Sequence, residues 1–340
     1  MKMSKNGWFV RLLAAAIGFV AMSGCGKGEK NSTDGNAIYY WRTTFKLSNY
    51  ERDFLKKHDI NKMYVKFFDV DNDWDHGAVP VGTTLFLDSM PSGVEIVPTI
   101  FITSEAIAKY PEFIDKLYTR VVDMADANGI TFKEIQIDCD WKEGAAPKYF
   151  AFMKELKSKL EKDKIALSTT IRLFQLGYEV PAADYGVLMC YNTGDINKWE
   201  TENSILDPAD VKPYLEKLKQ YKLPLSVALP CFSWNVIFDS WSGDGDNRYM
   251  EGIEYKDYDF TESKIFEKIA ENRYYKVTEN NGYHNHRYIR HEEVDIETLD
   301  EVKKMIINNL PSTPKQFVIY HLDSVNLSKY SDNDVEKIYR

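Results

Sequence analysis

Two carboxylates and an amide stand at alternate positions in the segment Glu134–Trp141. Gln136, Asp138 and Asp140 are each separated by one residue, so in an extended strand their side chains would project from the same face. The Cα atoms of the two Asp residues would lie about 6.5–7 Å apart. Like charges at that spacing can raise the pKa of one carboxyl group and keep it protonated near neutrality. The segment therefore predicts acid–base chemistry of the kind that glycoside hydrolysis requires, which uses two carboxyl groups in different environments.

The same two carboxylates also have a structural explanation. Either Asp138 or Asp140 could form an ion pair with Lys66 or Arg172 inside the fold. Ion pairs of this kind fill protein interiors without taking part in catalysis. The sequence leaves both explanations open.

Strand-like and helix-like patterns alternate along the chain from residue 37, and this alternation predicts how the carboxylates are positioned. We expect a (β/α)8 barrel, an α/β fold in which eight parallel strands alternate with helices. The chain has no G-x-G-x-x-G turn after its first strand and no G-x-x-x-x-G-K-[ST] loop. The usual reasons to expect an open nucleotide-binding sheet are therefore missing. The expected strands are Ile38–Phe45, Lys62–Val70, Val94–Thr103, Glu134–Trp141, Ile165–Arg172, Gly186–Asn192, Leu225–Phe232 and Gln316–Asp323. The expected helices are a segment capped by Ser48 that ends near His58, then Pro111–Asn128, Pro147–Lys162, Pro208–Tyr221 and Val294–Asn309.

Residues 233–293 interrupt the alternation after the seventh strand. We expect a helix at Glu262–Asn272 and a hairpin of Tyr274–Thr278 with Arg287–Glu292, closed over Asn280-Asn281-Gly282. The apolar content is low for a separate domain. Long insertions in compact domains are often functional loops, so we place this one near the barrel mouth.

Active sites of (β/α)8 barrels are built at the carboxyl ends of the strands. Asp138 and Asp140 are the catalytic candidates. Tryptophans near strand ends could stack on sugar rings or fill the core, and His321 could contact a ligand or satisfy Asp323. Phe68, Asp69, Thr170, Cys231 and Tyr320 also end strands, but receive no assigned role. The substrate-binding candidates are Trp41, Arg42, Lys66, Gln136, Trp141, Arg172, Tyr191, Asn192, Trp234, His321 and Asp323.

The first 25 residues form a targeting segment. Lys2, Lys5 and Arg11 precede an apolar run that is too short to span a bilayer. The sequence Met22-Ser23-Gly24-Cys25 then resembles the lipoprotein box of bacteria, which implies a lipid on Cys25 and a membrane-anchored protein of the cell envelope. An ordinary secretory signal is the alternative. Residues 26–36 are expected to form a flexible tether, and residues 37–330 the barrel domain.

Composition excludes several functions. The net charge is −9, which disfavours nucleic acid as a partner. Cys139, Cys190 and Cys231 sit in apolar strand patterns, and we expect buried free thiols. The spacing of His284-Asn285-His286 and of Asp69–Asp73 does not fit a known metal motif. We therefore expect no metal and no cofactor, and the sequence does not indicate an oligomeric state.

The run Ile137-Asp138-Cys139-Asp140-Trp141 resembles the fourth strand of family 18 glycoside hydrolases, where alternating Asp residues end in Asp-Trp-Glu. The resemblance implies a barrel that acts on a glycan. Lys142 stands where that family carries its acid Glu. Glu143 follows one residue later, where a strand would turn it to the opposite face.

The chain also resembles an uncharacterised bacterial family of (β/α)8-barrel lipoproteins that carry a Gln-Ile-Asp-x-Asp strand. This resemblance implies the same fold and a glycosidase-like activity without an established substrate. It rests on Gln136–Asp140, Tyr149-Phe150, Leu167–Arg172, Val187–Asn192 and Val227–Pro230.

Three functional hypotheses remain. In the first, the protein is a glycoside hydrolase-like lipoprotein in which Asp140 is acid or base, Asp138 tunes it, and Arg172, Tyr191, Asn192 and Trp234 position the sugar. In the second, Lys142 marks the loss of the acid, and the barrel binds a glycan without catalysis. In the third, the barrel is a structural scaffold. Fold analogy alone does not separate these hypotheses.

Overall fold

A computed structural model of the chain describes residues 34–240, 247–277 and 287–340. The expected signal segment 1–25 with Cys25 and most of the tether 26–36 lie outside the described residues. So do the hairpin turn Asn280-Asn281-Gly282 and the motif His284-Asn285-His286.

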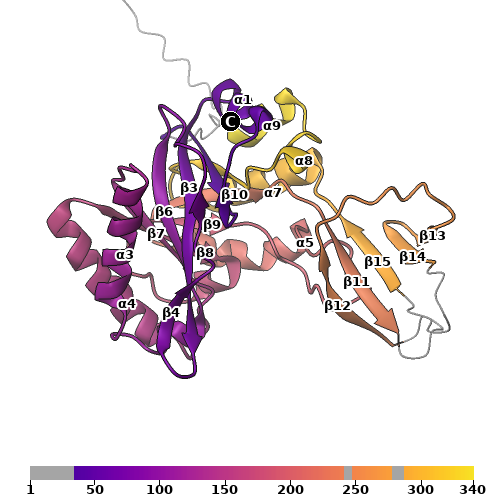
Figure 1. Cartoon of the computed structure of the whole chain (residues 1–340). Coiled ribbons are helices and arrows are strands. Elements are labelled where there is room, and N and C mark those ends of the chain that lie inside the picture. Colours follow the sequence, from indigo (N-terminus) through magenta and orange to yellow (C-terminus); the bar gives the residue numbers. More distant parts are fainter. Residues whose placement is uncertain (1–33, 241–246, 278–286) are drawn as a thin grey trace, which may run out of the picture.

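Eight parallel strands close into a barrel (Figure 1). Their order is β1-β16-β10-β9-β8-β7-β6-β3, and pairing of β1 with β3 completes the ring. The (β/α)8 prediction is therefore confirmed, and each of the eight expected strands overlaps an observed one. The barrel strands are β1 (Asn36–Tyr40), β3 (Ile60–Asp73), β6 (Glu95–Ile102), β7 (Glu134–Asp138), β8 (Ala166–Arg172), β9 (Tyr185–Met189), β10 (Leu225–Pro230) and β16 (Phe317–Tyr320).

Helices connect the strands and pack against the outer face of the barrel. Ser48 caps α1 as expected, because its side chain accepts a hydrogen bond from the amide of Glu51, whose side chain in turn accepts one from the amide of Ser48. The helix expected at Pro208–Tyr221 is confirmed as a helical segment, but it is not a single α-helix. A 3-10 turn at Lys212–Tyr214 joins two short α-helices, and it contains Pro213, which lacks a backbone donor. The helices are α1 (Asn49–Lys57), α2 (Ser104–Ile107), α3 (Ile114–Ala127), α4 (Ala146–Leu160), α5 (Pro208–Val211), α6 (Leu215–Gln220), α7 (Ile296–Asn309), α8 (Ser324–Leu327) and α9 (Asp332–Tyr339).

Strand β3 is the longest strand and contains a β-bulge. Lys66 pairs with Thr99 of β6, but Phe68 pairs with the next residue, Ile100, so Phe67 is the extra residue of the bulge. The far end of β3 pairs with the antiparallel strand β4 (Gly77–Val81). A short parallel pair, β2 (Thr44–Phe45) and β5 (Leu85–Phe86), lies outside the barrel sheet. The bulge brings Lys66 and Asp69 to the same face, although they are three residues apart.

The insertion after β10 forms a second sheet, with the order β12-β11-β15-β14-β13. Figure 1 shows this sheet projecting from the barrel on the side away from α3 and α4. Pairing of β14 with β15 agrees with the expected hairpin. The helix expected at Glu262–Asn272 is wrong, because that segment contains strand β13, which pairs with β14. The strands are β11 (Trp234–Ser240), β12 (Arg248–Glu254), β13 (Phe266–Ala270), β14 (Arg273–Lys276) and β15 (Arg287–Glu292).

The three cysteines after Cys25 are buried free thiols, as expected from the sequence. Burial raises the pKa of the Cys139, Cys190 and Cys231 thiols above the ordinary range, so all three are protonated and unreactive at neutral pH. Among the residues that the structure describes, no helix is both long enough and apolar enough to cross a membrane.

Candidate active site

A cavity of about 550 Å³ opens at the carboxyl ends of the barrel strands. A larger hollow of about 630 Å³ lies against α3 on the outer surface of the barrel. The barrel-mouth cavity is the better candidate, because it gathers ionisable and aromatic side chains from several strand ends. Its lining is Trp41, Lys66, Asp69, Phe101, Asp138, Arg172, Tyr191, Asn192, Phe232, Trp234, Tyr255, Tyr320, His321 and Asn326.

Asp138 is the last residue of β7 and is only 4% exposed. The Thr170 hydroxyl donates a hydrogen bond of 2.6 Å to its Oδ1, and Nη2 of Arg172 lies 4.0 Å from the same oxygen. Burial raises the pKa of this carboxyl to about 6; Arg172 opposes the rise and Asp140 adds to it. Asp138 therefore holds a transferable proton under mildly acidic conditions.

Asp140 occupies a different environment. Strand β7 ends at Asp138, so the alternation that would place Asp140 on the same face no longer applies. Arg172 holds the Asp140 carboxylate with two hydrogen bonds, from Nε at 2.5 Å and from Nη2 at 3.3 Å. The Asp140 side chain is 48% exposed and does not line the cavity. The ion pair considered as the structural alternative thus forms between Asp140 and Arg172.

Lys66 and Asp69 form a second ion pair within the cavity wall. Nζ of Lys66 lies 2.6 Å from Oδ2 of Asp69 and 5.6 Å from the centre of the Trp41 ring. Burial raises the pKa of Asp69, and Lys66 opposes that rise. Two carboxylates, Asp69 and Asp138, therefore line the cavity.

Aromatic side chains line much of the cavity. The rings of Tyr191 and Tyr320 lie 4.7 Å apart, and Phe232 packs edge-on against Trp234 at 5.3 Å. The Arg172 guanidinium lies 5.3 Å from the Tyr191 ring centre. Flat aromatic faces beside hydrogen-bonding groups suit the apolar faces and the hydroxyl groups of a sugar.

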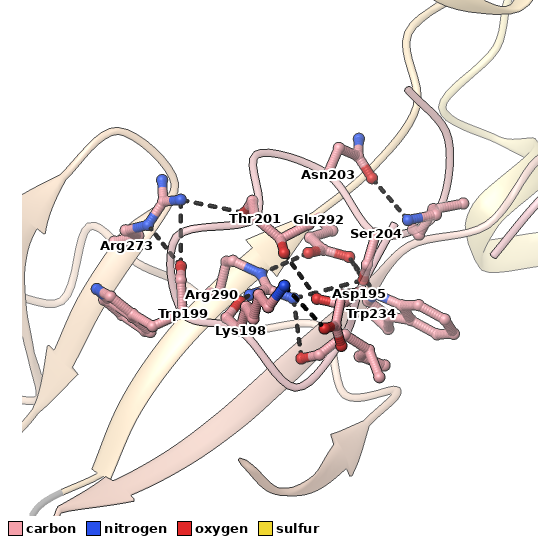
Figure 2. Close-up of polar contacts among 12 residues, drawn as sticks. Asp195, Lys198, Trp199, Thr201, Asn203, Ser204, Trp234, Arg273, Arg290 and Glu292 are labelled. Carbon is pink, nitrogen blue, oxygen red and sulfur yellow. Dashed lines mark hydrogen bonds and ion pairs between the residues drawn. The ribbon is translucent and has the colours of Figure 1, made fainter. Parts of the chain in front are cut away.

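Trp234 is fixed from the insertion sheet. Its indole Nε1 donates to Oε2 of Glu292, at 2.6 Å. Glu292 in turn forms a fully buried ion pair with Arg290, with a distance of 2.5 Å between Oε1 and Nε. Figure 2 shows this cluster between β15 and the loop that follows β9. Arg290 also donates hydrogen bonds to the carbonyls of Ile196 and Lys198 in this loop. The cluster therefore links the insertion sheet to the loop and fixes the Trp234 side chain at the cavity.

His321 follows β16 and lines the cavity. Burial lowers the pKa of its imidazole to about 4, so the ring is neutral at physiological pH. Within the described part of the chain, its buried Nδ1 has no hydrogen-bond partner. The backbone of Asn192 has a positive φ of 55°. Asn tolerates this left-handed conformation better than most residues.

Two substrate-binding candidates lie in the protein core instead. Gln136 faces the barrel interior below the cavity, where it accepts a hydrogen bond of 2.8 Å from the Tyr39 hydroxyl. Trp141 is fully buried and stacks on Tyr149 of α4, with ring centres 5.4 Å apart. Neither side chain lines the cavity.

Two other candidates lie beside the cavity and stabilise its rim. Arg42 forms ion pairs with Glu51 at 2.7 Å and with Asp323 at 3.1 Å. Asp323 also caps α8 by accepting a hydrogen bond from the amide of Asn326. Both side chains are therefore already engaged, and neither lines the cavity.

The other expected residues do meet at the cavity: Trp41, Lys66, Asp138, Arg172, Tyr191, Asn192, Trp234 and His321. Sequence analysis missed Phe101, Phe232, Tyr255 and Asn326, and it gave no role to Asp69 or Tyr320. A rule that takes every aromatic or carboxylate residue near a strand end as a candidate would have found four of these six: Phe101, Phe232, Asp69 and Tyr320. Tyr255 and Asn326 come from segments outside the barrel strands, where strand periodicity gives no signal. Within residues 34–240, 247–277 and 287–340, no group of three or more His, Cys, Asp or Glu residues could hold a metal ion.

Comparison with models of known protein families found no match, and comparison with curated protein sequences found none either. Solved structures do match in fold. A chitinase from Chromobacterium violaceum superposes with a TM-score of 0.56 and 13% identity, over 90% of this chain and 98% of the chitinase. A spore cortex-lytic enzyme from Bacillus megaterium gives 0.55 and 12%, over 91% and 75% of the two chains. A class V chitinase from Nicotiana tobaccum gives 0.52 and 11%, over 90% and 97%. At these identities the similarity shows a shared barrel fold.

Proposed function

We propose that this protein is a glycoside hydrolase-like protein that acts on a glycan, with Asp138 as its acid. The observation that carries the proposal is a buried carboxyl group whose pKa is raised to about 6, set in a cavity walled by aromatic rings. Glycosidic cleavage needs a carboxylic acid that still holds its proton under working conditions. Asp138 meets that requirement because burial disfavours its charged form.

The proposal changes the roles expected from the sequence. Asp140 was expected to be the acid or base, with Asp138 tuning it. Because Arg172 holds Asp140 outside the cavity lining, we assign the proton donor to Asp138. Arg172 then limits how far the pKa of Asp138 rises, while Asp140 adds to the rise and holds the Arg172 guanidinium in place.

The solved structures of similar fold support a glycan ligand. A variant of the Nicotiana tobaccum class V chitinase was solved in complex with NAG4, and a group IV chitinase from Ostrinia furnacalis in complex with allosamidin. The Asp-x-Asp-Trp run resembles that of family 18 glycoside hydrolases. The Gln-Ile-Asp-x-Asp strand further supports membership of the uncharacterised barrel-lipoprotein family.

The lipoprotein box also supports a place for the protein in the cell. We infer that Cys25 is lipidated and holds the protein in the bacterial cell envelope. A Cys25→Ser variant should lose incorporation of a labelled fatty acid and should leave the membrane fraction. Retention of the label by the variant would contradict this assignment.

A panel of chromogenic glycosides and a glycan array test the proposed activity. Wild type, Asp138→Asn and Asp140→Asn are compared on the same panel. We expect wild type to release product, Asp138→Asn to lose at least about 100-fold in kcat, and Asp140→Asn to shift the pH profile while retaining turnover. Equal rates for wild type and Asp138→Asn would refute the acid assignment.

One observation favours a second function. Lys142 stands where the family 18 motif has its acid Glu, and both Lys142 and Glu143 are exposed. The barrel could therefore bind a glycan without cleaving it. In that case the array would show binding by wild type and by Asp138→Asn without product release, and Trp234→Ala would abolish that binding.

A further inference from the structure

Asp69 and Asp138 lie on the two strands that flank β6, and both project from the same face of the sheet. Asp69 of β3 is in register with Phe101 of β6, and Phe101 is in register with Asp138 of β7. Residues in register on parallel strands project from the same face, and all three line the cavity. Two strand spacings of about 4.8 Å place the Cα atoms of the two Asp residues roughly 9–10 Å apart.

The Asp69 carboxylate is built into a specific position. Its Oδ2 is held by Lys66 at 2.6 Å, while its buried Oδ1 has no hydrogen-bond partner among the described residues. Gly82, with φ of +53°, passes so close that a Cβ added there would lie 2.5 Å from Oδ2. A residue with a side chain at position 82 would therefore collide with the Asp69 carboxylate. Lys66 thus holds Oδ2 and Oδ1 is buried, while the Asp69 side chain as a whole is 21% exposed at the cavity.

The two carboxyl groups differ in how closely a cation approaches them. Among the described residues, Asp138 forms only a loose ion pair, with Nη2 of Arg172 at 4.0 Å. Asp69 has an ammonium group at 2.6 Å, which opposes the rise that burial gives to the pKa of this carboxyl. Asp140 cannot supply this second group, because both of its oxygens are engaged by Arg172.

We propose that Asp69 is the base of the reaction, opposite Asp138 as the acid. This inference rests on the proposed glycoside hydrolase function. Asp69 accepts a proton from a water molecule whose oxygen bonds to the anomeric carbon. The glycosidic C–O bond breaks, and its oxygen takes the proton of Asp138 and leaves as an alcohol. One water is consumed, and exchange of protons with solvent restores both carboxyl groups. Direct attack by water inverts the anomeric configuration.

The first test uses wild type alone. With a glycoside that the panel shows to be hydrolysed, ¹H NMR of the first product identifies its anomer. Inversion is the expected result, and retention would overturn the role of Asp69 as base. If wild type hydrolyses no glycoside while binding the array, the proposed activity itself fails, and the base assignment fails with it.

The second test uses variants of one strand. Asp69→Asn and Asp69→Ala should lower kcat by about 10²–10⁴-fold, with the glycan Kd changed by less than about threefold. Asp73→Asn is the matched control, because Asp73 is a carboxylate on the same strand whose side chain is 45% exposed and does not line the cavity. Sodium azide should restore turnover to Asp69→Ala and give a glycosyl azide of inverted configuration.

The variants also separate this inference from the proposed function. Activity of Asp69→Asn within about threefold of wild type, beside an inactive Asp138→Asn, would overturn the base and leave the acid in place. If the Asp69 variants fail to fold, Gly82→Ala displaces the carboxylate while keeping its charge, and it should lower kcat more than KM. Unchanged kcat in a folded Gly82→Ala protein would count against Asp69.

Discussion

Replacement of Asp138 by Asn should stabilise the protein at neutral pH. The pKa of this carboxyl is raised to about 6 in the folded state, from an ordinary value of 3.8. The folded protein therefore binds this proton more tightly than the unfolded chain does. The favourable contribution is fully present below about pH 4 and is lost as the pH rises through about 6. At pH 7.5 the folded state carries the cost of a buried, ionised carboxylate.

The size of that cost follows from the shift. A rise of about two pKa units corresponds to about 3 kcal/mol of unfolding free energy at 1.36 kcal/mol per unit. Asn is neutral at every pH, and its side-chain oxygen can still accept the hydrogen bond from Thr170. Its amide group takes the place of the second carboxylate oxygen in a buried site, which offsets part of the gain. We therefore expect Asp138→Asn to raise the unfolding free energy at pH 7.5 by about 1–3 kcal/mol.

Urea unfolding of wild type and variant between pH 4.5 and 8 measures this effect. The difference between the two proteins is the relevant quantity, because His321 acts with the opposite sign. The pKa of its imidazole is lowered to about 4, so its contribution is lost as the pH falls. The gain for Asp138→Asn should shrink as the pH falls below 6. A gain that does not vary with pH, or a loss of stability at pH 7.5, would refute the assignment of a raised pKa to Asp138.

Three further predictions concern the structure around the cavity. Glu292→Gln should lower the unfolding free energy by about 3–5 kcal/mol and shift the tryptophan fluorescence, because it leaves a buried arginine without its carboxylate. Arg287→Gln breaks only part-exposed ion pairs, so it should lower the unfolding free energy by less than about 1 kcal/mol in the same urea titration. Gly82→Ala should destabilise more than Gly93→Ala in thermal unfolding, because both glycines have positive φ but only Gly82 has atoms within 4 Å of the added Cβ; equal losses would contradict the close approach. Trp141→Ala should cost about 3–5 kcal/mol, and the folded fraction should bind glycans with unchanged Kd; a weakened Kd would place this ring in the ligand site.

The barrel could be predicted from sequence because its strands are buried on both faces. Such strands read as short apolar runs between helices, and the runs at Leu225–Phe232 and Ile165–Arg172 coincide with β10 and β8. The insertion sheet was less accessible to this reasoning. In β13 four of the five residues are exposed, so its sparse apolar residues lack a strand-like alternation. Pairing with β14, a tertiary contact, determines its conformation.

The candidate site was predicted in part, for equally local reasons. Period-2 reasoning placed Asp138 and Asp140 together, but the strand ends between them and Arg172 draws Asp140 away. The same reasoning would separate Lys66 from Asp69, because their spacing is odd. The bulge at Phe67 brings them to one face. Strand ends and bulges are set by pairing with neighbouring strands, which a single sequence does not display.

The two ends of the described chain meet at the opposite end of the barrel from the cavity. The amide of Asp34 donates to the carbonyl of Lys315, just before β16, and the Tyr339 hydroxyl donates to the carbonyl of Ala37 at the start of β1. A segment upstream of residue 34 therefore joins the barrel at the amino ends of its strands. A protein held to a surface through that segment would have its cavity directed outward, toward large polymers that cannot approach the surface itself. The length of the tether would then set how far the mouth reaches, and shortening it should impair action on an immobilised polymer more than on a small soluble glycoside.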